Sequence, residues 1–233
     1  MTRLWQKTAF SLISALALLT CPAWLQAAGE LHPFSHQFSA SSSGFPFSIR
    51  TQRTLTRDSN GLWRLEVSAS NWLGEIREST AFEWKGCDAS TRRYGYIRKG
   101  LGREKQALIK VADDKRASGN RNGKPVSYDV PDNTADKLSH VLSLQCKLAR
   151  GDADLSVDVA DERGVEQFHY QRTGEEWLET AAGRLLAVRV ERQRDDDSGR
   201  QTVLWFSPSH DYNLVRLLQV EDGDHHELNI QKF

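Results

Sequence analysis

Apolar and polar residues alternate with a period of two over much of the chain, and this constrains the fold more than any other feature. The pattern runs through residues 45–55, 63–69 and 76–84. Successive side chains of a β-strand point to opposite faces, so alternation gives one buried face and one wet face. This arrangement is typical of antiparallel sheets. We therefore expect a mostly β protein.

The stretch from Glu175 to Val220 reads as a meander of strands joined by tight turns. Within it, Val203–Phe206 and Leu214–Leu218 are apolar on both faces. Strands buried on both sides lie centrally, or where a sheet curls against a second layer. We expect a single curved antiparallel sheet, either a half-barrel or an open barrel meander.

One amphipathic helix is expected across the concave side of this sheet. Pro131-Asp132-Asn133 supplies a stop and a cap, Asp136 would lie in the first turn, and Gly151 follows the last turn. The apolar stripe at helical spacing consists of Leu138, Val141, Leu142, Leu148 and Ala149. The polar run Asp113–Lys124 is expected to be a loop or a hairpin tip.

The N-terminus has the features of a secretory signal peptide. Arg3 and Lys7 precede an apolar run over residues 9–19, and the small residues Ala27-Ala28 follow. We expect residues 1–28 to be removed and residues 29–233 to form one antiparallel β domain in the periplasm. No later segment has the roughly 20 apolar residues of a transmembrane helix.

Cys21 raises the alternative of a lipoprotein signal, in which a cysteine becomes the lipidated N-terminus. Thr20 is bulky for the position before such a cysteine. We therefore expect ordinary cleavage at Ala27-Ala28 rather than lipid anchoring.

Charge and cysteine content change when the signal peptide is removed. Losing Arg3 and Lys7 reduces the 31 basic residues to 29, against 31 acidic residues. This balance gives no electrostatic footprint for nucleic acid. Cys87 and Cys146 remain as a candidate disulfide in an oxidising compartment, with two buried free thiols as the alternative.

A curled sheet with a helix across it can enclose an apolar pocket, which is a frequent binding site for small molecules or acyl chains. Gln145 falls in the middle of the helical stripe and would either face that pocket or bond to nearby backbone. The residues expected to line a pocket are Trp63, Phe82, Trp84, Leu142, Gln145 and Trp205.

No nucleophile elbow, zincin helix, phosphate loop or dinucleotide fingerprint occurs in the sequence. We therefore expect no catalytic activity, no cofactor and no metal site. A hydrolase with a dispersed site would need a histidine that joins a carboxylate to a hydroxyl, and His169 and His210 are the candidates for that role.

The meander also carries a family resemblance. The segments Gly174–Arg184, Val188–Arg192, Leu204–Pro208 and Asp211–Arg216 resemble the bacterial domain of unknown function family 3108, and Asp136–Ser139 is similar to its helix entry. The resemblance implies an exported protein with a curved antiparallel sheet, in a family without an established activity, so it leaves the function open. We expect an exported binding or carrier-like protein, with an envelope protein-interaction or assembly factor as the alternative.

Overall fold

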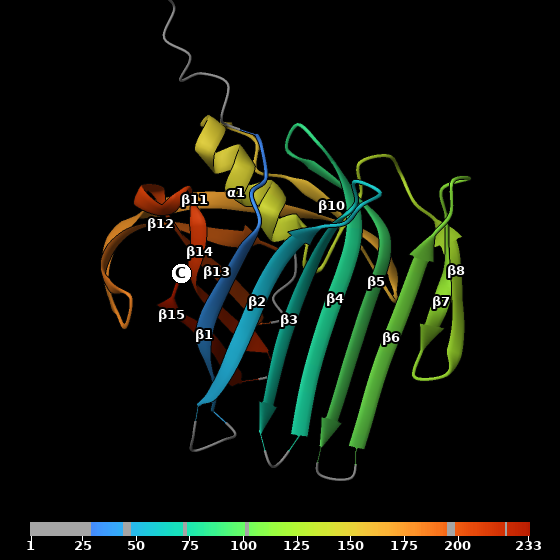
Figure 1. Cartoon of the computed structure of the whole chain (residues 1–233), viewed down its shortest axis with the longest axis horizontal. Coiled ribbons are helices and arrows are strands. Elements are labelled where there is room, and N and C mark those ends of the chain that lie inside the picture. The colour runs from blue at the N-terminus through green and yellow to red at the C-terminus, as the bar shows by residue number, and fades with distance from the viewer. Residues whose placement is uncertain (1–28, 44–47, 72–73, 101–102, 195–198, 222) are drawn as a thin grey trace, which may run out of the picture.

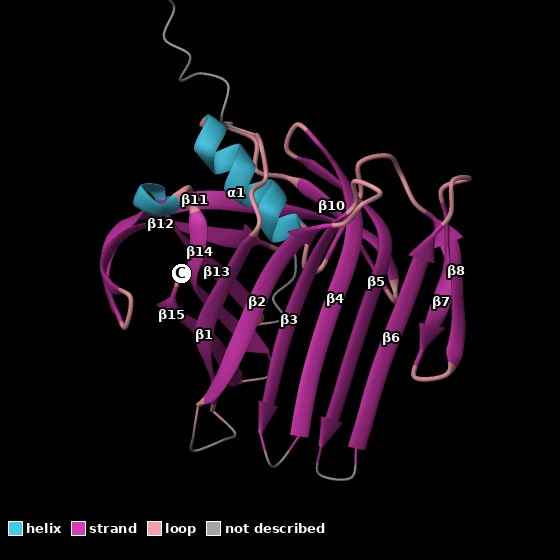
Figure 2. Cartoon of the chain, in the orientation of Figure 1, coloured by secondary structure: helices cyan, strands magenta, loops and turns pink. Residues whose placement is uncertain are grey.

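The computed structural model describes residues 29–43, 48–71, 74–100, 103–194, 199–221 and 223–233. The predicted signal peptide and Cys21 lie outside these residues. Within them the chain forms fifteen β-strands and one α-helix, α1 (His140–Arg150), with a short 3₁₀ turn at Pro208–His210. Figure 2 shows how far strands predominate. The mostly β fold expected from the alternating pattern is confirmed.

From β1 to β15 the strands span Phe34–Ser42, Ile49–Arg57, Trp63–Asn71, Gly74–Lys85, Asp88–Gly100, Arg103–Val111, Arg116–Arg121, Lys124–Asp129, Ala135–Asp136, Val157–Asp161, Gly164–Thr180, Gly183–Gln193, Gln201–Ser207, Asn213–Glu221 and Asp224–Lys232.

All these strands belong to one sheet, in the order β8-β7-β6-β5-β4-β3-β2-β1-β15-β14-β13-β12-β11-β10-β9. Strands that are consecutive in the chain pair as antiparallel hairpins, except β8 and β9, which lie at the two ends of the sheet; the pairing of β1 with β15 joins the two halves. One short parallel pairing, between β9 and β10, departs from this rule. Figure 1 shows β2 to β6 as one wall of the curled sheet, with β12 to β15 behind them. The predicted single curved sheet is confirmed, and it is open.

Helix α1 lies across the upper end of the space between the walls (Figure 1) and contacts β5, β9, β10 and β14. It begins at His140, later than the sequence suggested. Asp136 belongs to β9, and its fully buried carboxylate accepts hydrogen bonds from the backbone N–H groups of Leu138 and Ser139. Asp136 therefore caps the approach to the helix, which explains the misplaced start. Gly151 ends the helix in the left-handed conformation, as expected.

Half of the polar run at residues 113–124, which the sequence predicts to be a loop or hairpin tip, is strand β7, while residues 113–115 form the turn before it. Only Asn122 and Gly123 form the tip of the β7–β8 hairpin, both with positive φ. Gly119 lies within β7, at a point where β6 approaches so closely that a Cβ would be 1.8 Å from the Leu108 carbonyl oxygen. Only glycine fits there. A glycine that permits close strand contact was thus mistaken for a turn signal.

Two apolar clusters lie on opposite faces of β13. Leu204 and Phe206 belong to the larger cluster on the concave face, with residues of α1 and of β2 to β6. Val203 and Trp205 belong to a smaller cluster on the other face. The prediction that this strand is buried on both faces is confirmed.

A disulfide joins Cys87, in the turn between β4 and β5, to Cys146 on α1. The Cα atoms lie 5.4 Å apart and the residues are 59 positions apart in sequence. The bond attaches the helix to the wall that it covers.

Candidate functional site

Most of the pocket residues expected from the sequence are packed in the larger apolar cluster. Trp63 is 6% exposed, and Phe82 and Leu142 are fully buried. Trp84 packs against the same cluster, and its indole N–H donates to the Gly29 carbonyl at 2.7 Å. The structure brings these four side chains together, and none of them lines either of the two hollows described below.

Trp205 is not part of this group. It lies in the smaller cluster, where its indole N–H donates to the Glu176 carboxylate at 2.6 Å. The guanidinium carbons of Arg189 and Arg216 lie 5.8 and 4.8 Å from its ring centroid. Its neighbours Leu204 and Phe206 face the concave side. Because β13 is apolar on both faces, the alternation of its residues does not indicate which face Trp205 occupies.

Gln145 follows the second of its two expected uses. Its side-chain NH₂ donates to the backbone carbonyl of Asp211 at 3.0 Å and to the Asn213 side-chain oxygen at 3.3 Å. It therefore ties α1 to the turn that precedes β14.

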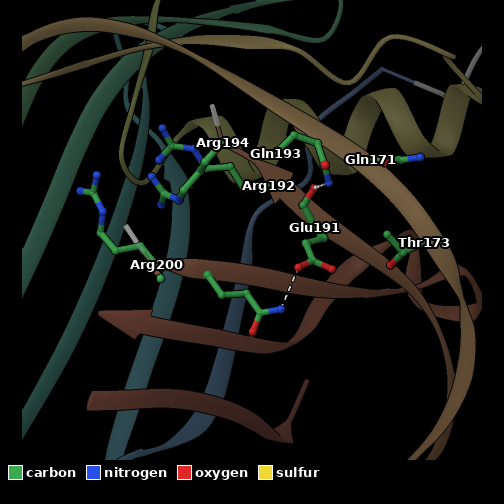
Figure 3. A pocket seen from close by; sticks show the side chains of 9 residues that line it. Gln171, Thr173, Glu191, Arg192, Gln193, Arg194 and Arg200 are labelled. Atoms are coloured by element: carbon green, nitrogen blue, oxygen red, sulfur yellow. Dashed lines mark hydrogen bonds between the residues drawn. The ribbon is translucent and has the colours of Figure 1, made fainter. Parts of the chain in front are cut away.

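A hollow of about 630 Å³ lies at the end of the β12–β13 hairpin. The ladder between these strands ends at the pair Glu191 and Val203. The hollow is lined by Gln171, Thr173, Glu191, Arg192, Gln193, Arg194, Gly199, Arg200 and Gln201. Figure 3 shows its three arginines grouped on one side and Gln171, Thr173 and Glu191 on the other.

The arginine side of the hollow follows from strand alternation. Arg192 continues the concave face of β12 after Val188 and Val190, which are both buried. Its side chain is 8% exposed, forms an ion pair with Glu166, and lies 3.3 Å from the centroid of the Phe168 ring. This alternation was the sequence signal for an inward-facing arginine, although Arg192 was not among the expected site residues.

Arg194 is the next residue on the same face. Its guanidinium donates to the Thr202 hydroxyl at 3.3 Å, while its Nε is buried and has no hydrogen-bond partner among the described residues. Glu191, on the opposite face, forms an ion pair with Arg189 at 3.0 Å and accepts from the Gln201 amide at 2.7 Å. Its charge is thus already matched by Arg189.

His140 is the first residue of α1, and its ring packs against Phe168 and Tyr170 of β11. Its Nδ1 is 3.1 Å from the Asp136 carbonyl, which can only accept, so Nδ1 carries the proton. Its Nε2 accepts from the Tyr170 hydroxyl at 3.0 Å. Burial, followed by the positive charges of Arg192 and Arg53, lowers the pKa of His140 to about 4. His140 is therefore neutral at pH 7.

A second group of polar residues lies on the wall formed by β4 and β5. Burial, together with the negative charges of Asp136 and Glu162, raises the pKa of Glu78 to about 7. Lys137 lies near this group and forms ion pairs of 2.9 Å with both Asp161 and Glu162. The concave face is therefore apolar beneath the helix and polar further along its strands.

The two histidines that a hydrolase would need do not form a catalytic arrangement. His169 Nδ1 is 2.9 Å from the Ser156 hydroxyl, and His210 Nδ1 is 3.0 Å from the Ser209 hydroxyl. Among the described residues neither histidine is hydrogen-bonded to a carboxylate. Neither of these two histidines is thus oriented by an acid, as nucleophilic catalysis by a serine requires.

A smaller hollow of about 240 Å³ lies beside the C-terminal part of α1. Its lining residues are Asp88, Asp132, Asn133, Lys147, Asp154, Ser156, Val157, Asp158 and Gln167. In the described part of the chain, no three His, Cys, Asp or Glu side chains are placed to share a metal ion. No helix in that part is long and apolar enough to cross a membrane.

Comparison with known proteins supports the fold and a family. A solved structure titled a β-barrel-like protein of domain of unknown function DUF1849, from Brucella abortus, matches with a TM-score of 0.57 and 10% identity. The match covers 86% of this chain and 96% of that one. None of the curated proteins matches. The model of the family "Protein of unknown function (DUF3108)" matches residues 82–224, so the chain belongs to the DUF3108 family.

Proposed function

We propose that this is an exported, non-catalytic binding protein that holds a small anionic ligand in the hollow at the end of β12. The observation that carries the proposal is the pair Arg192 and Arg194. Each has a buried Nε with no hydrogen-bond partner among the described residues, and both line the hollow. Buried polar groups are normally satisfied, and guanidinium groups match carboxylates and phosphates well.

An apolar ligand, such as an acyl chain in the interior, has less support. Its expected contacts, Trp63, Phe82 and Leu142, are packed against one another and against the rest of the larger cluster. A ligand there would have to displace core side chains, and core truncations or insertions are costly in close-packed interiors. The polar hollow needs no such displacement.

Export is supported by the N-terminal sequence and by the disulfide between Cys87 and Cys146. Disulfides persist in oxidising compartments and are rare in the cytosol. The test is fractionation of cells that express the full chain. We expect the protein in the osmotic-shock fraction, shortened by the signal peptide and with no free thiol. A full-length, reduced protein in the cytosol would contradict export.

Ligand binding is tested with the protein released by osmotic shock. Native mass spectrometry would detect a retained small anion, and calorimetric titration with citrate and inorganic phosphate would measure affinity. The double variant Arg194→Met/Arg200→Met should bind at least about tenfold more weakly, because charge-assisted hydrogen bonds are lost. Arg172→Met is the matched control, since Arg172 is exposed on β11 and does not line the hollow. Unchanged affinity in the double variant would exclude the hollow as the site.

A second candidate function is interaction with an envelope protein, and Trp177 is the observation that favours it. This residue is 57% exposed near the turn between β11 and β12, with the Arg184 guanidinium 4.8 Å from its ring centroid. Tryptophan and arginine are enriched at the centres of interfaces. Crosslinking from Trp177→p-benzoylphenylalanine in intact cells should capture a discrete partner, whereas the same probe at the exposed Arg50 should not.

A further inference from the structure

Arg53 is a buried charged residue without a counter-ion. It lies in the middle of β2 on the concave face, opposite His36 of β1 and Val67 of β3, and it is 5% exposed. Its Nη1 is buried with no hydrogen-bond partner, and no ion pair joins it to a carboxylate of the described residues. Burial lowers the pKa of Arg53 to about 10, so the guanidinium is charged at pH 7.

The neighbours of Arg53 offer aromatic rings and hydrogen-bond donors, and none of them is an anion. The guanidinium lies 5.0 Å from the centroid of the Phe34 ring, which stacks on His36 at 4.3 Å. The ring of Phe233 meets His36 edge-on at 5.3 Å and stacks on His210 at 4.2 Å. His36 Nδ1 is also buried and has no partner in the described part of the chain.

This arrangement leaves a large energetic cost uncompensated. Buried charges in proteins are normally paired, because the loss of hydration is several kcal/mol per ion. A cation–π contact with Phe34 offsets only part of that loss. Two strands thus place buried nitrogens without partners side by side, Arg53 Nη1 from β2 and His36 Nδ1 from β1. An acceptor from outside the chain would satisfy the guanidinium and, with the proton on Nδ1, His36 as well.

We infer that Arg53 and His36 form a binding site for the carboxylate group of a ligand whose body is apolar. The guanidinium supplies the charge and a two-pronged donor, and His36 supplies one further N–H. The rings of Phe34 and Phe233 flank the group and would contact the apolar body. The inference goes beyond the proposed function, because neither the residues nor the ligand are those of the hollow at β12.

The charge balance favours a carboxylate over a phosphate. Burial, Arg53 and His210 together lower the pKa of His36 to about 4, so His36 is neutral at pH 7 and Arg53 provides the one positive charge. A carboxylate neutralises one charge, whereas a phosphate monoester would bring about −1.5 to −2 and leave an excess.

Access to the site does not require the sheet to open. Phe233 follows Lys232, the last residue of β15, and is outside the strand ladder. Its ring is partly exposed, stacks on His210 and packs against the smaller apolar cluster. Turning the ring away from His36 would break these side-chain contacts but no strand pairing.

The experiment measures melting temperature and calorimetric affinity for octanoate, octanol and inorganic phosphate. Octanoate should raise the melting temperature of the wild-type protein, and octanol and phosphate should not. Arg53→Met should bind octanoate at least about tenfold more weakly. Without ligand, Arg53→Met should melt higher than the wild type, because an unpaired buried charge has been replaced by an apolar side chain of similar length. Arg53→Lys should retain part of the affinity.

Arg50→Met is the matched control, since Arg50 is an exposed arginine on the other face of the same strand. It should behave as the wild type does. The double variant Arg194→Met/Arg200→Met should keep octanoate binding, which separates this site from the hollow. Equal responses to octanol or phosphate would overturn the inference, as would no octanoate binding by the wild type. It would also be overturned if Arg53→Met kept its affinity, or if the unliganded variant melted lower than the wild type.

Discussion

The hydroxyl of Tyr94 donates a hydrogen bond of 2.5 Å to the carboxyl group of Glu78, from one strand to the next on the concave wall. Tyr94 is 2% exposed and Glu78 is half-buried. The hydrogen bond favours the ionised carboxylate, but burial has the larger effect and raises the pKa of Glu78 to about 7. Glu78 therefore exchanges its proton near neutral pH.

This shift makes stability depend on pH. The ordinary pKa of Glu78 is 4.5 and its folded value is about 7. The stabilisation by the protonated carboxyl is therefore complete below pH 4.5 and is lost as the pH rises through 7. Over that interval the wild type should lose on the order of 1–2 kcal/mol more unfolding free energy than Glu78→Gln. Urea titrations across the pH range measure this difference. Glu66→Gln, on the exposed face of β3, should follow the wild type, and parallel curves for Glu78→Gln would contradict the prediction.

Asp136 should be among the most sensitive positions in the fold. Its carboxylate is fully buried and accepts four hydrogen bonds, from the hydroxyls of Thr80 and Thr91 and from the N–H groups of Leu138 and Ser139. Asp136→Ala should lower the free energy of unfolding by at least about 3 kcal/mol, since each buried donor left unpaired costs about 1–3 kcal/mol. Denaturant titration checks this. Asp132→Ala, on an exposed turn residue, should change the stability little.

Reduction of the disulfide should destabilise the protein without altering the sheet. The bond between Cys87 and Cys146 closes a loop over a separation of 59 residues. On the chain-entropy model, such a loop contributes about 4 kcal/mol. Cys87→Ser/Cys146→Ser should therefore unfold at a lower urea concentration while its far-ultraviolet circular dichroism stays that of a β protein. An unchanged midpoint would show that the bond does not form in solution.

The tryptophans test whether the apolar face is core. Trp63 is 6% exposed, while Trp177 is 57% exposed. Trp63→Ala should cost about 3–5 kcal/mol of unfolding free energy, whereas Trp177→Ala should change it by less than about 0.5 kcal/mol. Thermal or urea denaturation compares the two variants directly. A small cost at Trp63 would instead indicate a loosely packed interior that could admit an apolar ligand.

Alternation predicted the fold because it is a local property that each strand carries by itself. Phe82 on β4 and Leu204 on β13 are buried because they lie on the apolar, inward-facing side of their strands, as the alternation predicts. Helix entry was misplaced because Asp136, taken as a first-turn residue, instead satisfies hydroxyl groups from two distant strands. That contact depends on tertiary structure and leaves no local signal.

The two proposed binding sites, one at Arg53 and one at Arg192, were harder to predict from the sequence than the core. Arg53 lies between Thr51 and Leu55 on the buried face of β2, and Arg192 follows Val190 on that of β12. Alternation therefore placed both arginines inside, against the usual rule that arginine is exposed. The sequence does not show whether a carboxylate forms an ion pair with either arginine, because such a partner comes from another strand. A charged residue at a position where the alternation predicts a buried side chain was thus the sequence signal for each site.

His140 should oppose Glu78 in its effect on stability. Burial, followed by the charges of Arg192 and Arg53, lowers its pKa from 6.5 to about 4. The unfolded chain then binds a proton that the folded protein refuses, so the stability present above pH 6.5 is lost as the pH falls through 4. His140→Gln should be less stable at pH 7, since it loses the bond to Tyr170, but its stability should fall by on the order of 1–3 kcal/mol less than that of the wild type between pH 6.5 and 4. His226→Gln, on an exposed strand residue, should keep the wild-type slope.

Because His140 favours folding at higher pH and Glu78 at lower pH, Glu78→Gln/His140→Gln should have a flatter pH profile than either single variant. A double variant as steep as either single variant would assign the pH dependence to other groups.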